Sequence, residues 1–125
     1  MVTAVEAPAT TANFSLELNE EQLQLQQRVH EFAEKVIRPA AHEWDEREET
    51  PWPIIQEAAQ VGIYGTQFIV HIQSDEAGLM LPIAIEELFW GDAGIGMAIV
   101  GTALAVAAIL GNGTPQQLGE WLPQC

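Results

Sequence analysis

The feature that most constrains this chain is an unbroken apolar segment, residues 93–110, which reads AGIGMAIVGTALAVAAIL. The segment contains no charged side chain, and Thr102 carries its only hydroxyl group. Its composition predicts a long helix, and Gly111-Asn112-Gly113 predicts where that helix ends. A helix that is apolar on every side has to be covered on every side, either by lipid or by protein.

Lipid is one possible cover, because about 18 apolar residues reach the lower limit for a transmembrane helix. Gly94 and Ala98 also provide a pair of small residues at the spacing used by packed membrane helices. No Lys or Arg follows Arg47, however, so the positive charge that orients membrane helices is missing. A single-span membrane protein through residues 93–110 is therefore an alternative, and we predict no membrane partner.

Protein is the other cover, and the small residues of the segment allow a helix or a ligand to approach closely. A chain of 125 residues has few helices to surround a central one. The missing cover would come from a partner subunit or from further domains of a longer chain. We favour the longer chain, since the sequence stops soon after Thr114-Pro115 begins another helix.

The rest of the sequence predicts an all-α fold. Asn19 is a good N-cap, with Gln22 at the position that a capping box requires. An apolar stripe follows, and Pro39 predicts a kink or short break near Arg38. Further helices are expected at about residues 40–47, 53–61, 81–89 and 115–122, whereas 67–73 is ambiguous, 74–78 is a turn and 1–13 is a flexible N-terminal tail.

Charge excludes several classes of function. The chain has 18 acidic residues against four Lys and Arg, and its net charge is −14. Nucleic acid and anionic lipid would be repelled, so we predict no nucleic-acid partner. Cys125 is the only cysteine, which excludes a disulfide within the chain and gives no metal site. The N-terminus has no secretory signal pattern, so a cytoplasmic location is expected.

No catalytic motif is present. The three histidines, His30, His42 and His71, have no metal-ligand spacing, and each is read as a surface or packing residue. There is no glycine-rich phosphate loop after a strand. Glu86 and Glu87 are adjacent on a helix and point apart, so one is expected in solvent and the other capped or paired. The sequence assigns no catalytic residue and no metal ligand.

Four stretches in a fixed order resemble the N-terminal helical domain of the acyl-CoA dehydrogenase family: residues 18–22 with 36–45, then 53–65, 86–94 and 111–123. The resemblance covers about residues 14–125. It implies the helical bundle of that fold in an incomplete chain, which continues in the family into a β-domain and a second helical bundle. It also implies an FAD-dependent oxidoreductase that desaturates an acyl-CoA thioester between its α and β carbons. An electron-transfer acceptor and a homotetramer or dimer are implied as partners.

The resemblance places the floor of the acyl pocket on the long apolar helix, at Ile95, Gly96, Met97, Val100 and Leu104. Positions 96 and 100 are often polar in medium-chain members, so Gly and Val here imply a less polar and deeper pocket. In the family, most FAD contacts and the catalytic glutamate lie after the matched region. The 125 residues alone are therefore expected to be inactive.

Residues 70–78 depart from the family pattern. They lack its Pro-Glu pair and double glycine, which implies a divergent subfamily. A non-catalytic helical interaction module that descends from the same domain is the remaining alternative.

Overall fold

The computed structural model describes residues 17–125, so the predicted tail at residues 1–13 lies outside the described part. Within that part the chain forms helices and no strand, which confirms the all-α prediction. The helices are α1 Glu20–Phe32, α2 Arg38–Arg47, α3 Trp52–Gln60, α4 Thr66–Gln73, α5 Met80–Gly91, α6 Ala93–Val100, α7 Thr102–Asn112 and α8 Pro115–Trp121, with a π-helical turn at Ala33–Ile37 and a 3₁₀ turn at Leu122–Gln124.

The first helix begins where its capping residues predict. The backbone N–H of Gln22 donates to the Asn19 side chain at 2.9 Å, and the Asn19 N–H donates to the Gln22 side chain at 2.9 Å. This reciprocal pair is the expected capping box. One face of α1 is buried, and it carries Leu25, Val29 and Phe32. The local signal at this helix start was sufficient because both partners lie within one turn.

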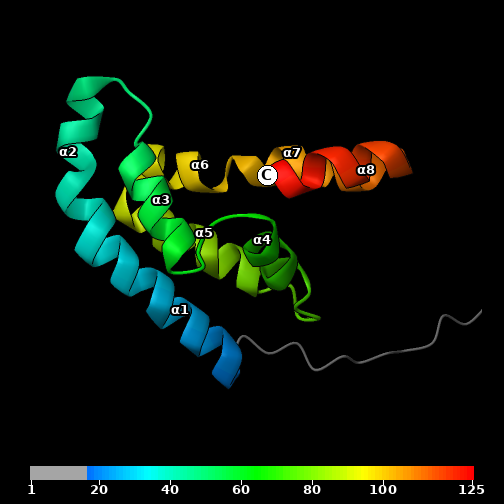
Figure 1. Ribbon diagram of the computed structural model, residues 1–125. Helices are drawn as coiled ribbons and strands as arrows, with labels where there is room; N and C mark the ends of the chain where they lie inside the picture. The colour runs from blue at the N-terminus through cyan, green and yellow to red at the C-terminus, as the bar shows by residue number, and fades with distance from the viewer. Residues whose placement is uncertain (1–16) are drawn as a thin grey trace, which may run out of the picture.

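The kink or short break expected near Arg38 is not a break, since the helix continues from α1 through α2 (Figure 1). A π-helical turn directly before Pro39 replaces the break, and the Arg38 N–H donates to the carbonyl of Ala33, five residues back. A π turn widens the helix at one point and changes the hydrogen-bond register. Pro39 follows in the first turn of α2, where its missing N–H costs little.

The ambiguous stretch at 67–73 is helical and forms most of α4. Two glycines with positive φ precede it, Gly62 at 73° and Gly65 at 93°. These angles suit glycine and explain the tight connection between α3 and α4. The predicted turn at 74–78 is present, and it contains a third such residue, Gly78, at 68°.

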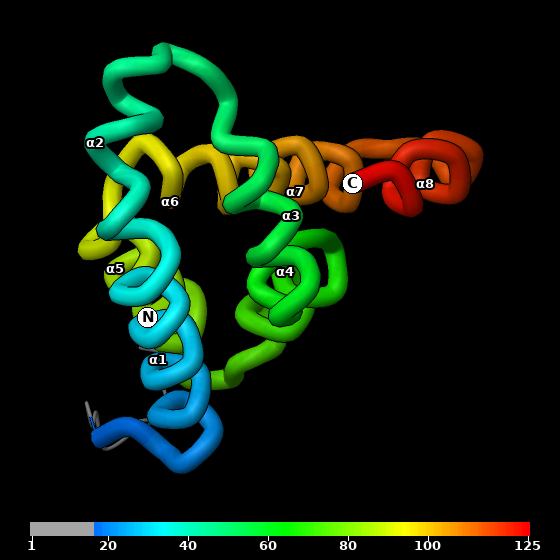
Figure 2. Tube along the Cα trace, turned by 60° about the vertical axis from the view of Figure 1, so that its left-hand side comes forward, coloured from blue at the N-terminus to red at the C-terminus, as the bar shows by residue number. Residues whose placement is uncertain are grey.

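The long apolar segment forms two collinear helices, α6 and α7, which meet at a turn at Gly101 (Figure 1). Asp92 caps α6, since its side chain accepts the Ile95 N–H at 2.8 Å. Thr114 and Gln117 form the predicted capping box of α8, at 2.9 and 3.3 Å. Figure 2 shows α7 and α8 extending away from the other helices, with α8 folded back beside the end of α7.

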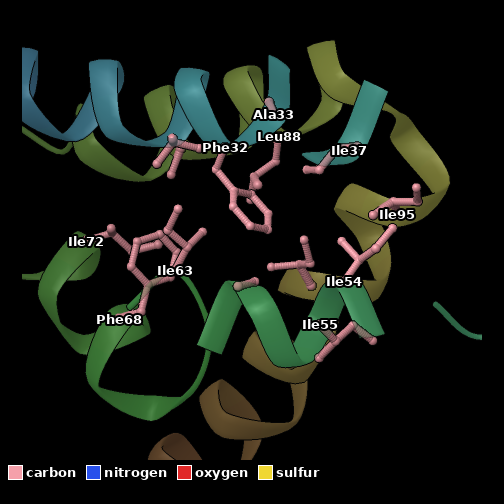
Figure 3. Close-up of a cluster of buried hydrophobic side chains, with 14 of the residues drawn as sticks. Phe32, Ala33, Ile37, Ile54, Ile55, Ile63, Phe68, Ile72, Leu88 and Ile95 are labelled. Carbon is pink, nitrogen blue, oxygen red and sulfur yellow. The ribbon is translucent and has the colours of Figure 1, made fainter. Parts of the chain in front are cut away.

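The core lies where α1, α3, α4, α5 and α6 face one another (Figure 3). Its buried side chains include Phe32, Ile37, Ile54, Ile63, Phe68, Ile72, Leu88 and Ile95. The end of the apolar segment does not share this core. Val106 is the only buried residue of α7, and Leu104 is 71% exposed. The expected cover on every side is therefore not supplied by residues 17–125.

Together α6 and α7, residues Ala93–Asn112, are long and apolar enough to cross a membrane, with a mean hydropathy of 2.2 and 22% of their most apolar 18 residues buried. Core helices of soluble proteins can have the same length and composition.

Candidate functional site

An apolar groove of about 390 Å³ lies between α4, α5, α6 and α7, with the loop before α4 at its edge. We call it the α4–α7 groove. Its lining has no charged side chain among the described residues, and Tyr64 and Gln73 are its only polar side chains. The lining residues are Tyr64, Gly65, Phe68, Ile69, Ile72, Gln73, Leu81, Ile85, Phe89, Met97, Ile99, Val100, Ala103, Leu104 and Ala107.

Helical spacing explains why these side chains converge. On α5, Leu81, Ile85 and Phe89 follow one another at intervals of four residues and so share one face. On α4, Phe68, Ile69 and Ile72 cover more than one turn of the facing surface. Together these two helices form one side of the groove.

The other side comes from the collinear pair α6 and α7. Met97, Val100, Leu104 and Ala107 follow at intervals of three, four and three residues, a single helical stripe that continues through Gly101. Because most of α7 is exposed, this stripe is open to solvent along part of its length. The groove can thus accept an elongated apolar group laid along α6 and α7.

One hydrogen bond fixes the edge of the groove. The hydroxyls of Tyr64 and Thr102 lie 3.1 Å apart and join the loop before α4 to the start of α7. Thr102 carries the single hydroxyl of the apolar segment, and this contact gives it a partner. The polar end of Tyr64 is therefore occupied, and its ring is left as a groove wall.

The structure divides the five predicted pocket residues into two groups. Met97, Val100 and Leu104 line the groove together. Ile95 is 3% exposed and packs in the core, beside Ile54 in Figure 3. Gly96 is also buried and faces α5. The part of each residue in substrate binding stays a prediction.

Gly96 makes a close helix contact. A β-carbon built at this position would lie 2.6 Å from Cδ1 of Phe89 and 3.3 Å from the carbonyl carbon of Leu88. Gly96 and Val100 are four residues apart, but only Val100 reaches the groove directly. Spacing along one helix could not reveal this difference, because it depends on where α5 crosses α6.

Sequence reasoning missed the α4 and α5 side of the groove. Leu81, Ile85 and Phe89 carried a usable signal, since their four-residue spacing marks an apolar helix face. Nothing in the sequence indicated that this face would meet Met97 and Val100.

A polar cluster joins α1 to α5 outside the groove. His30 Nδ1 lies 2.7 Å from a carboxylate oxygen of Glu87, and the His30 ring lies 4.5 Å from that of Trp90. Arg38 stands over Trp90 at 4.3 Å and donates to its carbonyl at 3.3 Å. Glu86 is exposed, so the expectation that one glutamate is solvated and the other paired agrees with the structure. This cluster stabilises the helix pair.

A second hollow, of about 430 Å³, lies between α1 and α3. Its sides carry Arg28, Glu31, Lys35 and Glu57, and Lys35 pairs with Glu31 at 3.1 Å. It contains none of the predicted pocket residues. Charged sides suit an apolar ligand poorly, so the α4–α7 groove is the better candidate although it is smaller.

The described residues do not fit a flavin dinucleotide site. Its diphosphate needs several cations or a glycine-rich helix start. Of the chain's four cations, Lys35 and Arg47 are paired with glutamates, and Arg38 lies on Trp90. Across residues 17–125 no cluster of three His, Cys, Asp or Glu could hold a metal ion.

Comparisons with known proteins identify similar chains. Residues 19–125 match the protein family described as acyl-CoA dehydrogenase, N-terminal domain. One relative is the probable medium-chain specific acyl-CoA dehydrogenase 2, mitochondrial, of Caenorhabditis briggsae. The two sequences are 31% identical over 117 residues, and this aligned region is 90% of this chain and 28% of that protein.

Two further relatives carry different names. The (2S)-methylsuccinyl-CoA dehydrogenase of Cereibacter sphaeroides is 30% identical over 113 residues, which are 86% of this chain and 20% of that protein. The mitochondrial isobutyryl-CoA dehydrogenase of Dictyostelium discoideum is 30% identical over 116 residues, which are 89% of this chain and 27% of that protein. The chain thus spans less than a third of the length of these relatives.

Proposed function

Because the chain belongs to the acyl-CoA dehydrogenase family and corresponds to its N-terminal helical domain, we propose that the α4–α7 groove holds the acyl tail of a CoA thioester. The three relatives share an acyl-CoA dehydrogenase name but differ in the acyl group that the name gives. The proposal rests only on what the three names share, an acyl-CoA as substrate.

The apolar lining of the groove is the observation that carries the proposal. A hydrocarbon tail gains about 0.8 kcal/mol for each methylene group that it removes from water. The groove supplies apolar contacts from both sides, and its volume of about 390 Å³ lies within the range of small-molecule sites. The tail would lie along the stripe that contains Met97, Val100 and Leu104.

The lining also favours an uncharged tail. A second carboxylate at the far end of the acyl group would be moved out of water without a partner, because no Lys or Arg lines the groove. The methylsuccinyl group in the name of one relative has such a carboxylate. We therefore propose that this chain takes a monocarboxylic acyl group, and the medium-chain name of another relative is compatible with that reading.

The complete reaction would need charged groups, and no charged side chain lines the α4–α7 groove. Bound FAD would accept the hydride when an acyl-CoA is desaturated, and a carboxylate base would remove the α-proton. We propose that both come from other parts of the enzyme, as does the cationic site for the CoA phosphates. This chain's own contribution is to bind the tail, orient it and exclude water from it.

The exposed apolar surface of α7 and α8 favours the presence of binding partners. Leu104, Leu110 and Trp121 are exposed there, and exposed apolar surface of this kind marks interaction sites. We propose that further domains or a homo-oligomer cover it and that an electron-transfer acceptor completes the reaction. The same exposure favours two alternatives, a non-catalytic interaction module and a membrane helix. Recovery of the chain from cells in the detergent-free supernatant would exclude the membrane helix.

A binding measurement tests the groove. S-octanoyl-N-acetylcysteamine is a neutral thioester that carries an acyl tail without the CoA nucleotide. We expect saturable binding to the 125-residue chain and a loss of more than tenfold in Val100→Asp, which places a charge in the groove. Val61→Asp is the matched control, since Val61 is 46% exposed and lies outside the groove. Equal binding by both variants would contradict the proposal.

A further inference from the structure

Phe89 lies where the wall of the α4–α7 groove meets the packing of α5 on α6. Its half-buried side chain lines the groove together with Met97 and Val100. The same ring covers Gly96, because a β-carbon there would stand 2.6 Å from Cδ1 and 3.0 Å from Cε1 of Phe89. The ring therefore occupies the space that any side chain at position 96 would need.

The backbone around Gly96 is held in place. The side chain of Asp92 accepts the Ile95 N–H at 2.8 Å, and its carbonyl accepts the Gly96 N–H at 2.8 Å. Asp92 is also the only residue between α5 and α6. The Asp92 N–H also donates to the carbonyl of Leu88 at 3.2 Å, so moving the two helices apart would break a bond to one of them. A side chain at position 96 would thus displace the Phe89 ring more readily than the backbone.

The displaced ring cannot move into the core. Phe89 packs on the buried core cluster, which includes the fully buried Leu88. Protein cores are packed as densely as organic crystals and leave no room for a shifted ring. The groove, by contrast, is open space beside the ring. A larger residue at position 96 therefore pushes Phe89 into the groove.

Resting on the proposed function of the groove, we propose that Phe89 limits the length and width of the acyl tail and that Gly96 positions it. Phe89 is the specificity-determining side chain, and Gly96 acts through it without touching the tail. The missing β-carbon at position 96 keeps the ring against α6 and the groove open. Residues 89 and 96 thus form a coupled pair, in which a large side chain at one position requires a small one at the other.

A double-mutant cycle tests this coupling. The S-butanoyl, S-octanoyl and S-decanoyl thioesters of N-acetylcysteamine are titrated into the wild-type chain, Gly96→Ala, Phe89→Ala and the double variant. Gly111→Ala is the matched control, because it lies on α7 outside the groove and a β-carbon there meets nothing within 4 Å. Thermal melting of every variant separates loss of binding from loss of folding.

We expect Gly96→Ala to leave butanoyl binding within twofold and to weaken decanoyl binding by at least fourfold, which is about the effect of one excluded methylene group. Phe89→Ala should raise the preference for the decanoyl over the butanoyl thioester. The double variant should bind the decanoyl thioester as Phe89→Ala does, because no ring is left to displace. Gly111→Ala should match the wild-type chain.

Three results would overturn the coupling while the groove itself still binds tails. In the first, Gly96→Ala weakens the binding of all three thioesters alike. In the second, the double variant loses as much decanoyl affinity as Gly96→Ala does. In the third, Phe89→Ala leaves the preference for tail length unchanged. The last result decides the question even if Gly96→Ala fails to fold. A wild-type chain that binds none of the thioesters would instead overturn the proposed function, and the coupling with it.

Discussion

The side-chain amide of Gln22 donates to both carboxylate oxygens of Asp75, at 3.1 and 3.3 Å, across 53 residues of sequence. Asp75 also accepts the backbone N–H groups of Leu79 and Met80, at 2.7 and 3.0 Å. One carboxylate therefore joins the first turn of α1 to the first turn of α5. α5 also supplies Leu81, Ile85 and Phe89 to the wall of the groove, so this link holds a helix that carries the wall.

Removing the amide should destabilise the chain. Gln22 is 1% exposed, and Gln22→Met would delete both its bonds to Asp75 and its half of the capping box. We expect a loss of about 1–3 kcal/mol in the free energy of unfolding, measured in urea. Gln24→Met is the matched control, since it removes only an exposed bond to Glu20. If both variants lost the same free energy of unfolding, the buried bonds between Gln22 and Asp75 would contribute nothing beyond an exposed hydrogen bond.

Asp75 should also make stability depend on pH. Burial acts to raise the pKa of its carboxyl group, but hydrogen bonds from Met80, Leu79, Gln22 and Ala77 outweigh it and lower the pKa below the ordinary 3.8. A lowered pKa in the folded state stabilises the fold above the ordinary value, and this contribution is lost as pH falls through the lowered value.

Urea titrations below about pH 5 should therefore show a steeper loss of stability in the wild-type chain than in Asp75→Asn. Glu76→Gln provides the control, because Glu76 is exposed and should keep the wild-type slope. A wild-type slope in Asp75→Asn would exclude Asp75 as the source.

Gly91 is required for the approach of α5 to the π-helical turn. A β-carbon at this position would lie 2.9 Å from Cγ2 and 3.0 Å from Cβ of Ile37, and 3.1 Å from Cβ of Ala33. Both neighbours are fully buried, so we expect Gly91→Ala to cost about 1–3 kcal/mol. Gly119→Ala has free space and should be neutral or stabilising by up to about 1 kcal/mol. Thermal melts that rank the two variants the other way would refute the close contact.

Local and long-range features differ in how far sequence predicts them. The capping boxes at Asn19 and Thr114 were predictable because both partners lie within one turn. At Pro39 an irregularity was predictable but its form was not, because composition does not encode a π turn that places the proline in the first turn of α2. The all-α class followed from the order of the helix signals.

The groove was predictable only on the side formed by the apolar segment, which makes up α6 and α7. Met97, Val100 and Leu104 form a stripe that spacing reveals, but the facing residues of α4 and α5 depend on how helices far apart in sequence pack. Gly96 illustrates the difference, since its role is set by the ring of Phe89 and not by its own stripe.

The 125-residue chain alone should not retain FAD. Its cations are few and largely engaged, and the described helices form no site for a diphosphate. After mixing with FAD and gel filtration, the chain should carry no visible flavin absorbance and should not oxidise an acyl-CoA. A yellow protein peak would contradict this expectation. The matched control is free FAD carried through the same column without protein.

The most direct test of the α4–α7 groove is isoleucine-methyl NMR of the chain during titration with S-octanoyl-N-acetylcysteamine. Ile69, Ile72, Ile85 and Ile99 line the groove, whereas Ile37 and Ile54 lie in the core away from it. If the groove holds the acyl tail, the first four methyl signals should shift in a saturable way and the last two should stay in place. Shifts confined to Ile63, which lines the hollow between α1 and α3, or no saturable shift at all, would contradict the proposed site.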